Sequence, residues 1–138
     1  MDKINVASIM IPKVCTVFLH EKNTVRQGLE IMTRYGYTCV PVLDQEEHYV
    51  GCISEGDFLR HMLATGSTDK KFHEQFHLNE IMRKECSPAL HIQADAAEML
   101  LAIMNQNFLP VVDDRNFLCG IVTRRSVITE LSRRLTNS

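Results

Sequence analysis

The sequence of 138 residues contains the same unit twice, and this repeat constrains its fold more than any other feature. Three segments of the first half recur in the second half: VPVLD at 40–44 as LPVVD at 109–113, YVGCIS at 49–54 as LCGIVT at 118–123, and ASIM at 7–10 as NEIM at 79–82. The first two recurrences share an offset of 69 residues, and the third has an offset of 72. A unit of this length cannot bury an independent core, so we expect the two copies to pack together.

Within each copy the hydrophobic period changes between helical and strand-like spacing. In the first copy the expected elements are, in order, a short strand near residues 14–19, a helix capped by Asn23 and ended by Gly36, strands at 40–43 and 49–53, and a second helix from Ser54. In the second copy they are a short strand near residues 89–92, a helix capped by Asp95, strands at 109–112 and 118–122, and a second helix from Thr123. Each copy therefore predicts the order β-α-β-β-α, an α/β fold of the α+β kind.

The repeat also predicts how the chain is divided. We expect motif 1 at residues 1–64, a polar and irregular connector at 65–78, and motif 2 at 79–138. The second helix of each motif has apolar residues at helical spacing: Phe58, Leu59, Met62 and Leu63 in the first, and Val127, Ile128, Leu131 and Leu135 in the second. Because two small motifs supply a limited core, we expect Phe58, Met62, Leu131 and Leu135 to be buried against a second chain.

Composition and charge exclude several classes of protein. Hydrophobic residues make up 45% of the chain, while Gly and Pro are few, which excludes a collagen-like or disordered chain. No apolar run reaches the roughly 18 residues of a membrane span, and the first residues lack the pattern of a signal peptide. A net charge of -2 argues against binding to a nucleic-acid polymer.

The cysteines indicate a reducing compartment. There are five of them, without C-x-x-C spacing: Cys15, Cys39, Cys52, Cys86 and Cys119. Most lie within apolar runs, where a thiol behaves as a small hydrophobic group. We therefore expect reduced packing residues in a cytoplasmic protein that does not associate with membranes.

The repeated segments resemble a known family. Each copy, with its Pro-Val-x-Asp strand and its Gly-x-x-Ser/Thr segment before a helix, is similar to a cystathionine-β-synthase (CBS) motif. Two in tandem resemble a pseudo-twofold Bateman module. This resemblance implies a regulatory, non-catalytic receptor for adenine nucleotides that pairs as a flat homodimer. The segments at 13–15, 36–38 and 120–125 resemble more narrowly the stand-alone bacterial CBS proteins that bind cyclic di-AMP (c-di-AMP).

The start of the last predicted helix is a candidate phosphate site. Thr123 would lie at its N-terminus, where unpaired N–H groups and the helix dipole favour an anion. Arg124 and Arg125 add permanently charged, forked donors, although a first helical turn usually prefers acidic residues. This departure suggests function. The alternative is a solvated helix face.

The resemblance assigns four further residues to this first cleft: Lys13, Cys15, Tyr37 and Thr38. It implies that the backbone near Cys15 and Thr38 reads adenine and that Tyr37 forms a stacking wall. Lys13 would hold phosphate together with the arginines. From the residues alone, Cys15 is a packing residue and Tyr37 a half-buried surface aromatic.

The resemblance also implies a second cleft. Ser54 and Asp57 match the family's ribose-binding pattern, in which the carboxylate accepts hydrogen bonds from both ribose hydroxyls, and they would face Ala89, Asn107 and Phe108. The alternative is that Ser54 and Asp57 form a capping box, which needs no ligand. The second copy has Ser126 in place of the aspartate, so the two clefts are unlike and their occupancy by one ligand is open.

One segment suggests a different class of protein. His73, Glu74 and His77 satisfy H-E-x-x-H, the signature of a zinc-hydrolase helix, with His61 and Glu80 as possible third ligands. The segment lies in the expected connector and lacks a supporting scaffold, so we expect no catalytic residue, metal or cofactor.

The residues and the resemblance together predict a sensor that acts on an unidentified protein target. The first expected ligand is c-di-AMP, and the second is AMP, ADP or ATP. A dimeric adaptor without a ligand and a small zinc hydrolase are the alternatives.

Overall fold

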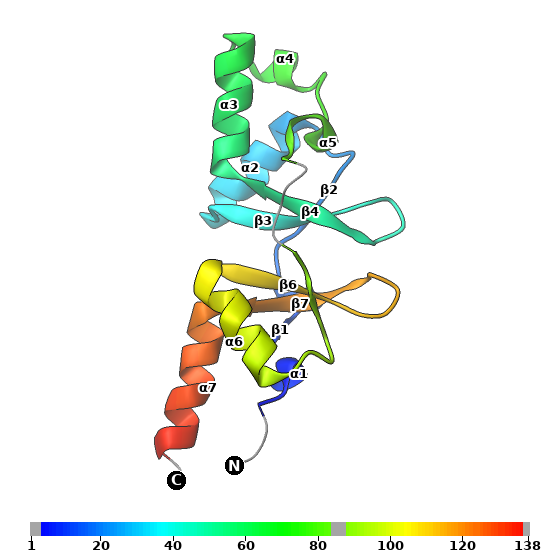
Figure 1. The fold of residues 1–138 in the computed structure, drawn as a ribbon. Coiled ribbons are helices and arrows are strands. Elements are labelled where there is room, and N and C mark those ends of the chain that lie inside the picture. Colours follow the sequence, from blue (N-terminus) through cyan, green and yellow to red (C-terminus); the bar gives the residue numbers. More distant parts are fainter. Residues whose placement is uncertain (1–3, 84–87, 137–138) are drawn as a thin grey trace. The chain divides into compact units, whose positions relative to one another are not determined.

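A computed structural model describes residues 4–83 and 88–136 (Figure 1). The chain forms two compact units, and each is described by itself. The Asp57 unit comprises residues 17–86, and the Arg125 unit comprises residues 1–16 together with 87–138. Within the described residues, no helix is both long and apolar enough to cross a bilayer.

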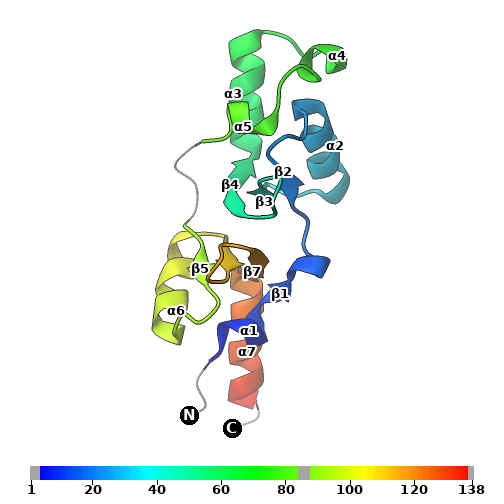
Figure 2. The ribbon, with the colours of Figure 1, turned by 90° about the vertical axis from the view of Figure 1, so that its right-hand side faces the viewer.

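The Asp57 unit has a three-stranded sheet with helices packed on it. The strand order is β2 (Leu19–His20), β3 (Cys39–Leu43) and β4 (Tyr49–Ser54), with β2 parallel and β4 antiparallel to β3. The helices are α2 (Val25–Tyr35), α3 (Glu55–Thr65), α4 (Lys70–His73) and α5 (Leu78–Ile81) (Figures 1 and 2). Their buried apolar side chains form one core: Leu19, Val25, Met32, Val40, Val42, Ile53, Phe58 and Leu78.

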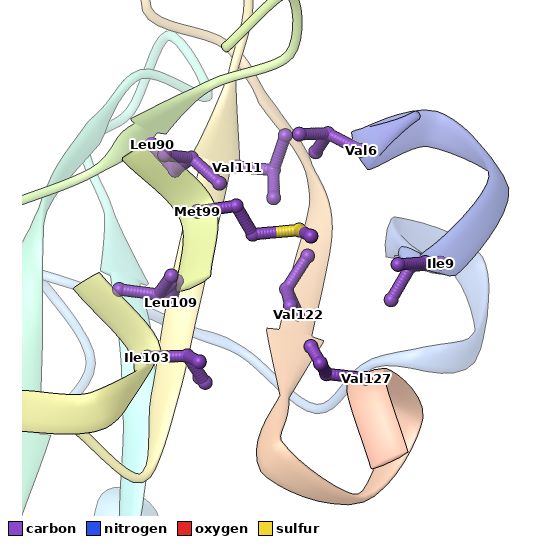
Figure 3. Packing of buried hydrophobic residues seen from close by; sticks show 9 residues of the cluster. All are labelled: Val6, Ile9, Leu90, Met99, Ile103, Leu109, Val111, Val122 and Val127. Atoms are coloured by element: carbon purple, nitrogen blue, oxygen red, sulfur yellow. The ribbon is translucent and has the colours of Figure 1, made fainter. Parts of the chain in front are cut away.

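The Arg125 unit repeats this plan with one more strand. Its sheet has the order β1 (Ile11–Pro12), β7 (Leu118–Thr123), β6 (Phe108–Val112) and β5 (Leu90–His91). The helices are α1 (Val6–Ile9), the 3-10 turn η1 (Lys13–Cys15), α6 (Ala96–Asn105) and α7 (Arg124–Thr136). Figure 3 shows its core, in which Met99 and Ile103 of α6 face Leu109, Val111 and Val122 of the sheet.

The N-terminal segment packs on the second repeat rather than on the first. Ile11 of β1 pairs with Ile121 of β7, and Pro12 pairs with Gly120. A Cβ at Gly120 would lie only 2.1 Å from the carbonyl oxygen of Ile11, so the close approach of β1 requires glycine there. Residues 1–16 therefore belong to the same compact unit as residues 87–138, and the division of the repeats into residues 1–64, 65–78 and 79–138 stays a prediction.

The local elements agree with the sequence in most places. Both hairpins are present, Gly36 ends α2 in the left-handed region at φ 69°, and α3 and α7 begin directly after Ser54 and Thr123. The cap of α2 is Thr24 rather than Asn23, because Thr24 exchanges capping-box hydrogen bonds with Gln27.

Two other local predictions were wrong. The strand expected near residues 14–19 is the turn η1 followed by the two-residue strand β2, and Val14 is 93% exposed. The connector is not irregular, because it contains α4 and the first residue of α5, and it buries His73 and Leu78.

The burial of single residues also corrects the sequence analysis. Phe58 is buried within its own unit, so it is not available to a second chain. In contrast, Leu59, Leu63, Ile128 and Leu135 are exposed. Among the cysteines, Cys15 is exposed rather than packed, Cys52 is buried, and Cys39 and Cys119 are half-buried, while Cys86 lies outside the described residues.

Candidate functional site

The start of α7 forms one wall of a pocket in the Arg125 unit. Ser126 donates from its backbone N–H to Oγ1 of Thr123 at 2.9 Å, and Thr123 donates from its N–H to Oγ of Ser126 at 3.0 Å. These bonds fix the first turn. Next to it is a pocket of about 340 Å³ lined by Arg125, Ser126, Thr129 and Glu130 of α7, Thr123, and Ser8, Ile9 and Ile11 of the N-terminal segment.

The two adjacent arginines have different surroundings. The guanidinium of Arg124 donates to the carbonyl oxygens of Ile103, Met104 and Gln106 at 3.0–3.1 Å, where α6 ends. Arg124 thus caps α6, a structural role that the sequence analysis did not assign. Arg125 is exposed at the pocket and has no ion-pair partner in the described part of the chain. The guanidinium of Arg125 is therefore accessible at this pocket, and phosphate binding by Arg124 and Arg125 stays a prediction.

The other predicted residues of the first cleft are divided between the units. Lys13 and Cys15 lie in η1, which contacts β7. Burial raises the pKa of the Cys119 thiol, Asp113 raises it further, and the charge of Lys13 opposes both, so Lys13 lies near that strand. These residues share the Arg125 unit with the start of α7.

Tyr37 and Thr38 belong to the Asp57 unit, between α2 and β3. Tyr37 is exposed beside Tyr35, with ring centroids 6.4 Å apart. The carbonyl oxygen of Thr38 accepts a hydrogen bond from the backbone N–H of Glu55 at 3.0 Å, which places Thr38 at the start of α3. The assembly of all seven residues into one cleft stays a prediction.

Asp57 lies in a capping box at the start of α3. It is only 3% exposed, and its Oδ2 accepts hydrogen bonds from the Ser54 N–H at 2.8 Å and from Ser54 Oγ at 3.2 Å. The capping interpretation is therefore confirmed, and the hydrogen bonds of the capping box occupy one carboxylate oxygen of Asp57. The other, Oδ1, accepts a hydrogen bond from Arg60 and has Nε of Arg83 at 4.0 Å.

The arginines beside Asp57 were missed by the sequence analysis. The spacing of Asp57 and Arg60, three residues apart on one helix, was the available signal, because such side chains are neighbours. Cys39 also lies near this carboxylate. A hydrogen bond with Cys52 lowers the pKa of Cys39, while burial and the negative charge of Asp57 oppose that shift.

The remaining residues of the second cleft lie in the Arg125 unit. Ala89 precedes β5, and Asn107 is exposed in the turn after α6. Phe108 is half-buried at the start of β6, where it pairs with Thr123. Since Ser54 and Asp57 belong to the other unit, the second cleft also stays a prediction.

The H-E-x-x-H segment does not form one helix. The helix α4 ends at His73, Glu74 pairs with Arg26, and His77 precedes α5. His73 is 2% exposed, and both of its ring nitrogens are engaged, Nδ1 with Nε2 of His61 at 3.0 Å and Nε2 with the carbonyl oxygen of Ser67 at 2.7 Å. The two histidines of the motif therefore do not share a helical face, and the residues described contain no group of three side chains that could hold a metal.

Comparison with known proteins agrees with the repeat and with the fold. The family model of the CBS domain matches residues 6–64 and 78–133. The chain belongs to the CBS-domain family. It is 27% identical over 113 residues to cyclic di-AMP receptor B of Bacillus subtilis. The aligned residues make up 82% of this chain and 76% of the receptor.

Two further comparisons differ in how much of the other protein this chain covers. The chain is 30% identical over 122 residues to inosine-5'-monophosphate dehydrogenase of Methanocaldococcus jannaschii, but it spans only 22% of that enzyme. The crystal structure of CbpB in complex with c-di-AMP superposes with a TM-score of 0.88 at 22% identity, covering 97% of this chain and 88% of CbpB. The tandem CBS fold is therefore shared with that protein.

Proposed function

We propose that this CBS chain is a non-catalytic receptor for c-di-AMP that transmits ligand binding to a partner protein. The proposal is carried by Arg125 at the start of α7, which is exposed and forms no ion pair with any described residue, in a chain that matches a c-di-AMP receptor over 82% of its length. A forked guanidinium beside helical N–H groups suits a phosphodiester anion. The c-di-AMP complex of CbpB, which has the same fold, supports the same ligand class.

In this proposal, different residues of the first cleft bind different parts of the ligand. Arg125, the N–H groups of the first turn of α7, and Lys13 hold phosphate. The backbone near Cys15 and Thr38 reads adenine, and the exposed ring of Tyr37 forms the wall of the cleft. Arg124 acts indirectly, because it ties α7 to α6 and so fixes the direction of the helix start.

A calorimetric titration with c-di-AMP, AMP, ADP and ATP tests the ligand. We expect c-di-AMP to bind most tightly and to raise the melting temperature, because a ligand that binds only the folded state stabilises it. A melting temperature that none of the four nucleotides changes would favour the ligand-free adaptor instead.

A second candidate ligand is an adenine mononucleotide at Asp57. The specific observation that favours it is the buried carboxylate at the start of α3, whose position matches the ribose-binding aspartate that the family resemblance implies. The two ligands differ in their need for Asp57 and Arg125, and variants of these residues distinguish them.

We also propose that the chain forms a homodimer through its helices. Leu29, Met32, Leu59 and Met62 are among the residues that line a groove of about 360 Å³ between α2 and α3. Leu59 and Leu63 of α3 are 63% and 84% exposed. An apolar surface of this kind on a small protein is suited to a surface of a second copy. Analytical ultracentrifugation should show a dimer, which Leu59→Lys should dissociate, whereas a monomeric wild-type profile would contradict this proposal. A cytoplasmic location and an unidentified protein target complete the proposed role.

A further inference from the structure

The first helices of the two repeats, α2 and α6, present different surfaces. When the two helices are aligned by their N-caps, Glu30 and Thr33 of α2 correspond to Leu101 and Met104 of α6. All four residues are exposed, and the two apolar ones are 66% and 71% exposed. Residues three apart on a helix are neighbours, so each pair forms one patch. Equivalent patches are thus polar on α2 and apolar on α6.

The patch on α2 borders a hollow. Thr33 lines both the groove of about 360 Å³ between α2 and α3 and a neighbouring pocket of about 550 Å³ that extends to α4. Leu29 and Met62 also line both of them, so the two hollows adjoin, and we call them together the α2 groove. Where α6 carries the long side chain of Met104, α2 therefore carries a short one beside an open space.

The charges of the α2 groove and of α6 are opposite. Arg34 and Lys70 line the larger hollow, and neither forms an ion pair with a described residue. The third cation of this hollow, Arg26, is already paired with two carboxylates. On α6 the one charged residue is Glu98, which lies one turn before Leu101. The apolar patch of α6 is therefore flanked by an acid, and the groove is flanked by cations.

We propose that two copies of the chain pair head to tail, with Leu101 and Met104 of each copy in the α2 groove of the other. The Asp57 unit of one copy then contacts the Arg125 unit of its partner. The inference rests on the proposed homodimer and specifies which surfaces meet. Each copy carries one groove and one apolar patch, so a two-fold axis makes the same contact twice and covers both surfaces. Burial of the apolar side chains stabilises the contact, and the opposite charges orient it.

Pairing of like units would match these surfaces less well. The groove of one copy would face the groove of the other, so that Arg34 and Lys70 face cations, and Glu98 would face its own counterpart. Such like-charge contacts are unfavourable. Leu59 of α3 and Ile128 of α7 occupy equivalent positions and are 63% and 60% exposed, so they suit both arrangements. The choice between the two arrangements depends on α2 and α6.

Analytical ultracentrifugation of full-length variants tests whether the patch and the groove contribute to one contact. Met104→Ala should weaken the dimer at least about tenfold, because each copy buries this side chain. Thr33→Met should weaken it to a similar extent, because the added atoms fill the groove. The matched control is Val14→Ala, which shortens a 93% exposed apolar side chain outside these helices and should leave dimer affinity unchanged. Unchanged affinity of Met104→Ala and Thr33→Met would overturn the inference.

Cross-linking of cysteine variants tests the orientation. The background is the full chain with Cys15→Ser and Cys86→Ser, in which the other native cysteines are buried or half-buried. A short bismaleimide should join the double variant Thr33→Cys/Met104→Cys into covalent dimers, with position 33 of one copy linked to position 104 of the other in peptide maps. Each single variant should give no covalent dimer on a denaturing gel.

Other outcomes overturn the inference at separate points. A single variant that cross-links as efficiently as the double variant would show that like units pair. A wild-type dimer whose double variant does not cross-link overturns the head-to-tail contact and leaves the homodimer in place. A monomeric wild-type protein overturns the homodimer itself, while its binding of c-di-AMP tests the proposed receptor separately.

Discussion

Arg124 donates a hydrogen bond from Nε to the carbonyl oxygen of Ile103 at 3.1 Å, and this bond ties the start of α7 to the end of α6. Its neighbour Arg125 points to a pocket and makes no ion pair within the residues described. Adjacent arginines that look alike in the sequence therefore have different surroundings: Arg124 contacts the end of α6, whereas Arg125 faces a pocket, where we propose that it binds phosphate.

Substitution of the two arginines should separate these roles. Arg124→Gln should lower the free energy of unfolding by about 1–2 kcal/mol, because carbonyl groups at the end of α6 lose a charged donor. Arg125→Gln should change it by less than about 0.5 kcal/mol, as expected for an exposed side chain that forms no ion pair among the residues that the structure describes. Urea denaturation measures both values, and equal losses would contradict the assignment.

A second prediction concerns the pairing of β1 with β7. Gly120→Ala should destabilise the protein by at least about 2 kcal/mol, because its Cβ would overlap the carbonyl oxygen of Ile11 and push β1 away. Gly56→Ala is the matched control, since its Cβ would lie 3.4 Å or more from its neighbours. Denaturation curves of the two variants should differ clearly, and similar curves would argue against the packing of the N-terminal segment on β7.

Glu130 should stabilise the protein in a defined pH range. A hydrogen bond from Arg133, and after it one from Arg134, lowers the pKa of Glu130 from 4.5 to about 2. Because the folded protein holds this proton less tightly than the unfolded chain, the stabilisation is complete above pH 4.5 and is lost as the pH falls towards 2. The difference in unfolding free energy between wild type and Glu130→Gln should shrink over this range. A constant difference would contradict the ion-pair assignment.

His61 should affect the stability of the protein at a higher pH than Glu130 does. Burial lowers the pKa of His61, the neighbouring His73 lowers it further, and Glu80 partly opposes them. The unfolded chain then takes up a proton before the folded protein does, so stability should fall as the pH drops below about 6.5. His61→Gln should reduce this slope in urea denaturation series between pH 7.5 and 5.5. An identical slope in both proteins would show that His61 does not titrate in this window.

Local sequence signals predicted the elements of this fold because their causes lie within a few residues. Gly36 ends α2 since glycine adopts a positive φ without strain, and Ser54 with Asp57 caps α3 through neighbouring atoms. The pairing of β1 with β7 has a cause far away in the sequence. Gly120 was a sequence signal for this close pairing, but a single glycine does not identify which strand packs against it.

In the candidate site, too, the features with local causes could be predicted from the sequence, and those with distant causes could not. The helix starts and their charges were readable from the repeat, since Thr123, Arg125 and Asp57 occupy equivalent turns. The capping role of Arg124 was not, because its acceptors on α6 are about 20 residues earlier and become neighbours only in the folded unit. The burial of His73 was not predicted either, because its partner His61 is 12 residues earlier and becomes a neighbour only in the folded unit.

The central claim is that c-di-AMP binds at the start of α7, and one titration tests it most directly. Calorimetry should show c-di-AMP binding to the wild-type protein and to Arg115→Gln, an arginine in the turn between β6 and β7. Binding to Arg125→Gln should be at least about tenfold weaker, with an unchanged melting temperature of the free protein. Equal c-di-AMP affinity of wild type and Arg125→Gln would contradict the account.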